Sequence, residues 1–138
     1  MLNRVRTLLL YTWAGPNTLL GLGFGVLAKA TGGGWQIHTG VVEVYGGRVA
    51  RLLEHAPFVP GGAMALTLGH CVLARSQAAH EITRKHERVH VRQYERWGPL
   101  FLPGYVLVGV IAWAKGRDPY RDNAFEIEAY NNDGQDRA

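Results

Sequence analysis

Apolar and charged residues repeat with a helical period between Ser76 and Trp97. One face is formed by residues spaced three or four apart, namely Ala79, Ile82, His86, Val89, His90, Gln93 and Trp97. The opposite face carries Glu81, Arg84, Arg88, Arg92 and Glu95. This spacing predicts an amphipathic helix. Ser76 is a suitable N-cap, and Gly98-Pro99 predicts the helix end.

Two stretches before this helix are rich in strand-forming residues. Residues 35–55 predict a hairpin, in which Gly46-Gly47 supplies a two-residue turn that tolerates positive φ. After a break at residues 57–62, the apolar run from Ala63 to Ala74 predicts a further strand. We expect an α+β fold, in which a small antiparallel sheet packs on the helix that follows these strands and on a further helix downstream.

The chain after the helix divides into an apolar and a polar part. Residues 100–116 contain a single charge, on Lys115, and are barely long enough to span a bilayer. A core or interfacial helix from Pro103 to Lys115 is therefore favoured over a membrane span. The polar part predicts a loop, a short helix at residues 123–130 and a flexible tail at 131–138.

The first 34 residues form an apolar segment that allows three interpretations. Arg4 and Arg6 before an apolar run, with Ala28-Lys29-Ala30 as a cleavage site, fit a signal peptide. A membrane span is the second interpretation, although Pro16 interrupts the run. The third is a short N-terminal turn or helix, followed by a second helix that Pro16 and Asn17 open and that ends at residues 31–34. We favour this last interpretation, with a retained segment that is membrane-associated or packed on the core.

Composition limits the class of protein and its compartment. The chain has 138 residues, a net charge of +4 and 47% hydrophobic residues, which indicates one globular domain. Its basic residues are not interleaved with aromatic ones in a nucleic-acid-binding pattern, so we expect no nucleic-acid partner. A single cysteine, Cys71, excludes an intrachain disulfide. We expect a cytoplasmic or membrane-associated protein, with a cell envelope of the bacterial type as the alternative.

The predicted helix carries the sequence His86-Glu87-Arg88-Val89-His90. Histidines four apart lie one turn above each other and can bind one metal ion. Glu87 lies about 100° round the helix, where it can reach a water on that metal. The chance that this pattern arises by accident in such a chain is on the order of 1%.

A catalytic zinc ion usually has three protein ligands and a water, so two histidines leave it one ligand short. Glu126 and Glu128 lie in the short helix downstream, which can fold back onto the first helix. Positions two apart on a helix point to different faces, so we expect only one of them to reach the metal.

These features resemble the gluzincin type of zinc metallopeptidase, in which an HExxH helix is followed by a helix that supplies a glutamate. The resemblance is to the pattern E-x-x-A-D, which Glu126 to Tyr130 matches except that Tyr130 stands in place of aspartate. It implies a minimal zincin-like domain at residues 35–130, Zn²⁺ bound by His86, His90 and Glu126, and a strand at Ala63–Ala74 that aligns an extended peptide. Asp122, Asn123 or Tyr130 could replace the missing aspartate as the group that orients a histidine ligand.

The expected function is therefore hydrolysis of peptide bonds in a peptide or protein substrate, with Glu87 as general base. Tyr120 and Tyr130 are the preferred candidates for stabilising the oxyanion, and Tyr105 and His70 are further ones. A non-catalytic, membrane-associated zinc protein is the main alternative. A third hypothesis is a cationic lipid-surface protein in which the motif is accidental.

Overall fold

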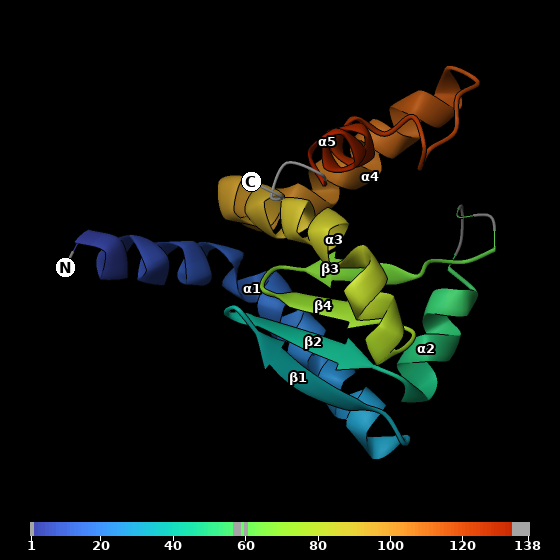
Figure 1. The fold of residues 1–138 in the computed structure, drawn as a ribbon. Helices are drawn as coiled ribbons and strands as arrows, with labels where there is room; N and C mark the ends of the chain where they lie inside the picture. Colours follow the sequence, from blue (N-terminus) through green and yellow to red (C-terminus); the bar gives the residue numbers. More distant parts are fainter. Residues whose placement is uncertain (1, 57–58, 60, 134–138) are drawn as a thin grey trace.

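The computed structural model describes residues 2–56, 59 and 61–133 of the chain. It has an α+β fold, as the sequence predicts (Figure 1). The elements in chain order are α1 (Leu2–Ala30), β1 (Gly34–His38), β2 (Val41–Tyr45), α2 (Gly47–Glu54), β3 (Ala65–Leu68), β4 (Cys71–Ala74), α3 (Gln77–Trp97), the 3₁₀ turn η1 (Gly98–Leu100), α4 (Phe101–Ala114) and α5 (Ala124–Asn132).

The strands form one mixed sheet in the order β1-β2-β4-β3. The pairs β1–β2 and β3–β4 are antiparallel, whereas β2 and β4 are parallel. The prediction of an antiparallel sheet is thus wrong for the central pair. Helix α2 and strand β3 lie between β2 and β4 in the chain, and this longer connection is what a parallel pair requires.

The first hairpin forms, but its turn lies at Thr39-Gly40 instead of Gly46-Gly47. Both turn residues have positive φ, 46° and 78°. Arg88 on α3 donates hydrogen bonds to the carbonyl oxygens of His38 and Thr39, so a distant helix holds this turn. Gly46 and Gly47 also have positive φ but lead into α2.

The predicted strand at Ala63–Ala74 is instead two strands joined by a tight turn at Gly69-His70. Gly69 has a φ of 64°, and a Cβ at this position would overlap Thr18 Oγ1 and lie 2.8 Å from the Ala14 carbonyl oxygen. The Thr18 hydroxyl accepts a hydrogen bond from the backbone nitrogen of His70. The turn therefore depends on the close approach of α1 to the sheet.

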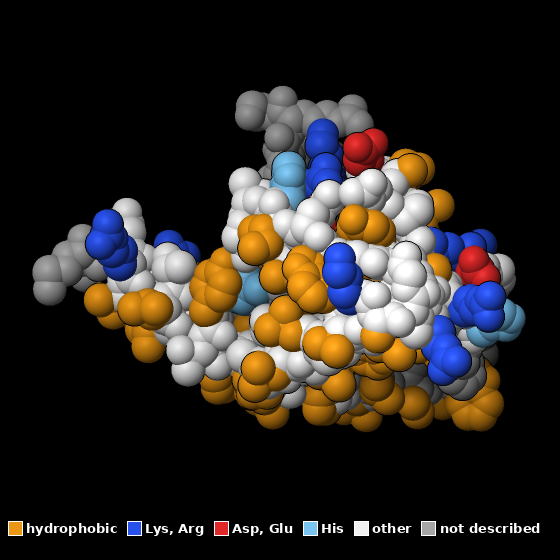
Figure 2. Space-filling model, turned by 90° about the horizontal axis from the view of Figure 1, so that it is seen from below, with side chains coloured by type: hydrophobic (Ala, Val, Ile, Leu, Met, Phe, Trp, Pro, Cys, Tyr) orange, Lys and Arg blue, Asp and Glu red, His pale blue; other side chains and the backbone are white. Residues whose placement is uncertain are grey.

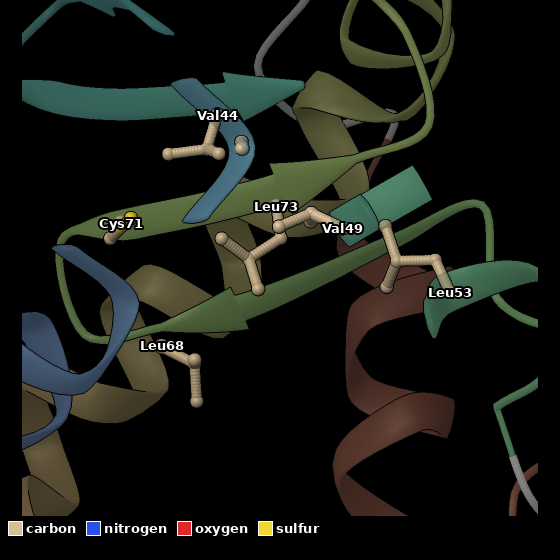
Figure 3. Packing of buried hydrophobic residues seen from close by; sticks show 7 residues of the cluster. Val44, Val49, Leu53, Leu68, Cys71 and Leu73 are labelled. Atoms are coloured by element: carbon tan, nitrogen blue, oxygen red, sulfur yellow. The ribbon is translucent and has the colours of Figure 1, made fainter. Parts of the chain in front are cut away.

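Helices cover both faces of the sheet (Figure 1). The face toward α1 and α2 holds the main core, and Figure 3 labels six of its members, which come from β2, α2, β3 and β4. This core consists of Ala28, Val44, Val49, Leu53, Leu68, Cys71 and Leu73. The face toward α3 holds a second cluster of Val41, Val72 and Val91. Successive side chains of a strand point to opposite faces of the sheet, so neighbouring residues of β2 and β4 belong to different clusters.

Helix α1 is continuous from Leu2 to Ala30 and contains Pro16, so the prediction of two separate helices is wrong. It changes direction partway along (Figure 1), as helices do at proline. The half after Pro16 packs on the fold through buried positions at Asn17, Gly21, Gly25 and Ala28. This packing compensates for the backbone hydrogen bond that proline removes.

Helix α3 has the predicted limits: the Ser76 hydroxyl accepts a hydrogen bond from the Ala79 nitrogen, and Gly98 ends the helix with a φ of 56°. Two residues expected to face inward, Ile82 and Trp97, are 72% and 45% exposed. Helix α4 agrees with the predicted apolar helix. Helix α5 extends through Asn132, two residues into the expected flexible tail, and residues 134–138 lie outside the described part.

A broad apolar surface remains open to solvent on α1. Leu8, Leu9, Leu19, Leu20 and Val26 are each at least half exposed. In Figure 2, apolar side chains gather along the lower border of the molecule, starting from the projecting N-terminal end of α1. Separately, the helical stretch Gln77–Ala114 is long and apolar enough to cross a membrane by length and composition, and only 22% of its apolar window is buried.

Candidate metal centre

The two histidines of α3 and one glutamate of α5 meet at a single point. His86 Nε2 and His90 Nε2 lie 3.3 Å apart, because residues four apart share one face of the helix. Glu126 Oε2 lies 3.0 Å from His86 Nε2 and 3.3 Å from His90 Nε2. Among the described residues, this is a group with the donor types and spacing to hold a metal ion.

The spacing of these atoms matches tetrahedral zinc coordination. Zinc–nitrogen and zinc–oxygen bonds of about 2.0–2.1 Å at a tetrahedral angle separate two ligand atoms by about 3.3–3.4 Å. The three separations in the chain are 3.0–3.3 Å. Two imidazoles and one carboxylate are also a usual donor set for catalytic zinc. The residues present therefore fit a zinc ion.

Helix α5 reaches α3 because its first turn is anchored at several points. Asn123 caps the helix through its side-chain oxygen, which accepts from the Phe125 nitrogen, and its amide donates to the Tyr105 carbonyl. The Phe125 ring packs against Trp97, Phe101 and Tyr105. Glu128 is not part of this group of candidate ligands, and its Oε1 accepts a hydrogen bond from Gln93 at 3.3 Å.

Two further side chains orient the candidate ligands. Gln93 Oε1 lies 2.8 Å from His90 Nδ1, so it accepts the proton on this nitrogen and turns Nε2 toward the centre. The Tyr105 hydroxyl donates to Glu126 Oε1 at 2.8 Å. The sequence places Gln93 only on the inner face of the helix, and its spacing of three from His90 was the signal for this contact.

The centre favours a positive charge. Burial opposes ionisation of Glu126, but hydrogen bonds from His86 and His90 outweigh it and lower the pKa of Glu126 to about 2. Burial also opposes protonation of His90, but the bond to Glu126 and the charge of Glu87 raise the pKa of His90 to about 9. A cation among these groups is thus stabilised by buried carboxylate charge.

Glu87 lies on the same helix and is buried, 6% exposed. Its Oε2 accepts a hydrogen bond of 2.6 Å from the hydroxyl of Thr67 on β3. Burial lets its charge act on both His90 and Tyr105. A strand hydroxyl thus fixes the orientation of this carboxylate, and nothing in the spacing of the sequence indicates Thr67.

The two tyrosines expected to stabilise an oxyanion lie beside the histidines. The Tyr130 ring packs against His86 at a tilt of 51°, with 4.4 Å between centroids, and its hydroxyl lies 3.1 Å from that of Tyr120. Tyr105 is engaged by Glu126, as above. His70 is separate from this group, because it stacks on Tyr11 and bonds Glu95 at 2.8 Å.

Of the three replacements considered for the missing aspartate, Asp122 and Asn123 have other partners, whereas the Tyr130 ring lies against His86. Asp122 accepts from the Asp118 nitrogen, and Asn123 caps α5. Asp133, at the end of α5, has its Oδ2 3.9 Å from His86 Nδ1. Gln93 therefore orients His90. Asp133 is the carboxylate that faces the Nδ1 nitrogen of His86.

No protein-family model, curated protein or solved structure matches this chain. The resemblance to the gluzincins therefore rests on two features of the sequence, the HExxH motif and the downstream pattern that begins at Glu126.

Proposed function

We propose that the protein is a zinc-dependent metallopeptidase in which His86, His90 and Glu126 hold the metal. The observation that carries this proposal is the convergence of three donor atoms at 3.0–3.3 Å beside a buried, hydrogen-bonded Glu87. A structural zinc site usually has four protein ligands, whereas three leave a position for water and are typical of catalysis.

Each residue of the site has a defined role in this proposal. Zinc, when bound, lowers the pKa of a coordinated water to about 7 and polarises the substrate carbonyl. Glu87 accepts the proton of the attacking water and passes it to the leaving amine. Thr67 holds Glu87 Oε2, so the carboxylate is oriented before substrate binds. Tyr130, whose ring packs against His86, and Tyr120, whose hydroxyl lies 3.1 Å from that of Tyr130, stabilise the developing oxyanion in this proposal.

The position of β3 supports an extended peptide as substrate. This strand lies at the edge of the sheet, and its Thr67 contacts the proposed general base. A peptide that adds to such an edge forms backbone hydrogen bonds that are independent of its sequence. Binding along β3 would therefore bring a backbone carbonyl to the side of α3 that carries His86 and His90.

Two measurements on purified protein test this function. We expect one zinc per chain in the wild type and less than a tenth of this content in His86→Ala. Glu87→Gln should retain zinc and lose peptide hydrolysis, while Glu81→Gln, a change on the exposed side of the same helix, should retain both. Cleavage by zinc-loaded Glu87→Gln at the wild-type rate would refute the assigned general base.

A non-catalytic zinc protein is the second candidate, and one observation favours it. The candidate ligands and Tyr105 connect α3, α4 and α5, so a metal there would also tie three helices together. Under this alternative, chelation lowers the melting temperature sharply and no member of a peptide library is cleaved.

We further infer that the protein binds a membrane through the outer face of α1. Residues 7–28 carry no charged side chain, while Arg4 and Arg6 precede them and Lys29 follows. Cations at the ends of an apolar face match anionic headgroups, and the half of the helix after Pro16 packs on the fold with its opposite side.

Flotation with vesicles tests the membrane contact. The wild type should float with vesicles of phosphatidylcholine and phosphatidylglycerol at three to one. Leu19→Glu combined with Leu20→Glu should reduce the bound fraction at least about tenfold, since it places two charges on the apolar face. Ile82→Glu, an equally exposed position on α3, is the matched control. Equal flotation of the double variant and the wild type would refute the contact.

A further inference from the structure

An apolar cavity of about 410 Å³ lies between α4 and the turn that leads to α5. Tyr105, Val106, Gly109, Val110 and Trp113 line it from the helix. Pro119 and Tyr120 line it from the turn, and Val59 completes the wall. Its volume is at the lower end of the range of about 300–1,000 Å³ that is typical of small-ligand sites.

Gly109 allows the turn to approach α4 closely. A Cβ at this position would lie 3.1 Å from the Pro119 carbonyl oxygen and 3.5 Å from the Asn123 side-chain nitrogen. Asn123 also donates a hydrogen bond to the Tyr105 carbonyl, which fixes the turn against the helix. The cavity is therefore shaped by the same residue that caps α5 and positions Glu126.

Two tyrosines of the cavity wall connect it with the candidate metal centre. Tyr105 lines the cavity with its ring, and its hydroxyl bonds Glu126. Tyr120 lines the cavity, and its hydroxyl lies 3.1 Å from that of Tyr130, whose ring packs against His86. Each tyrosine thus has an apolar surface toward the cavity and a hydroxyl toward the site.

We propose that this cavity receives a large apolar side chain, aliphatic or aromatic, from the substrate residue next to the bond that is cleaved. The proposal rests on the metallopeptidase function above and adds the chemical class of the substrate. The shared tyrosines place the cavity beside the reacting groups, so a side chain in it would hold the neighbouring peptide bond at the metal centre. The apolar lining stabilises such a side chain by removing it from water.

The test compares the rates at which the protein cleaves matched peptides, all measured at one fixed detergent concentration. The substrates are fluorogenic ten-residue peptides whose central positions are alanine. In each peptide one residue next to the central bond, on one side or the other, is varied as Ala, Leu, Phe or Asp. We expect zinc-loaded wild type to cleave a Leu or Phe peptide with a kcat/KM about tenfold or more above that of the Ala peptide. Asp should be cleaved no better than Ala.

Two tryptophan variants locate the preference. Val110→Trp fills the cavity from a half-exposed position on α4 and should reduce the ratio of Leu to Ala cleavage to about one. Leu107→Trp adds the same ring at an exposed position of α4 outside the cavity and should retain the wild-type ratio. The proposal would be overturned if the wild type cleaved the Leu and Ala peptides with a kcat/KM ratio near one. It would also be overturned if Val110→Trp lowered kcat/KM for all peptides in equal proportion.

A binding measurement separates failure of the cavity from failure of the hydrolase function. Isothermal titration calorimetry of zinc-loaded Glu87→Gln should show that the Leu peptide binds at least about tenfold more tightly than the Ala peptide. Adding Val110→Trp to this variant should abolish the difference in affinity. This result without cleavage by the wild type would support the cavity and refute the peptidase. Equal binding of the two peptides, or binding of lauric acid but of neither peptide, would overturn the cavity as a side-chain site.

Discussion

Gln93 connects the candidate metal ligand His90 to helix α5, and its replacement by methionine separates these contacts from packing. The side chain is 1% exposed. Its oxygen accepts from His90 Nδ1 at 2.8 Å, and its nitrogen donates to the Phe125 carbonyl oxygen at 3.0 Å. Methionine has a similar length and adaptable packing but cannot form either strong hydrogen bond.

Two effects of Gln93→Met can be worked out from these contacts. The change leaves the His90 Nδ1 proton and the Phe125 carbonyl without these partners, and each buried polar group left unpaired costs about 1–3 kcal/mol. We therefore expect the free energy of unfolding to fall by about 2–6 kcal/mol. Loss of a group that orients a histidine ligand weakens metal binding about 10- to 100-fold, or about 1.4–2.7 kcal/mol.

Zinc affinity is measured by competition with a chromophoric chelator, under conditions where circular dichroism shows the variant to be folded. Urea unfolding of the metal-free protein gives the stability change separately. Gln77→Met is the matched control, because Gln77 lies at the exposed start of α3 and bonds only Gln36 among the contacts described for it. A zinc Kd for folded Gln93→Met within threefold of wild type would refute the role of Gln93.

Three further predictions concern the scaffold of the site. Burial opposes ionisation of Glu43, but hydrogen bonds from Arg84 and Gln36 outweigh it and lower the pKa of Glu43 below 4.5. The ionised carboxylate therefore stabilises the folded protein above pH 4.5, and this contribution is lost as the pH falls through the pKa of Glu43 in the folded state. Glu43→Gln should therefore cost about 2–3 kcal/mol in urea unfolding at pH 7 and progressively less below pH 4.5, and a constant difference would contradict this. Gly69→Ala should lower the melting temperature of the protein, because a Cβ there meets α1 at positive φ, whereas Gly23→Ala in open space should not. Leu73→Ala should lower the free energy of unfolding by about 2–5 kcal/mol, and Leu66→Ala on the exposed side of β3 by less than half of that; equal losses would argue against the core described above.

Much of the centre follows from local sequence rules. The four-residue spacing of His86 and His90 places them on one face of any α-helix, and Ser76 and Gly98 define the ends of that helix through contacts within a few residues. The short helix with Glu126 begins at an Asn123 cap that also acts locally. Such features depend on dihedral preferences and hydrogen bonds between near neighbours, which a sequence specifies directly.

The remaining features were decided by contacts between residues far apart in the chain. The turn at Thr39-Gly40 competes with Gly46-Gly47, and Arg88 on α3 binds the first of these. Helix α1 continues through Pro16 because the half after it packs on the fold. Thr67 meets Glu87 only because β3 pairs with β4 and both pack under α3. Several local conformations were compatible with these segments, and the free energy of packing in three dimensions selected one of them.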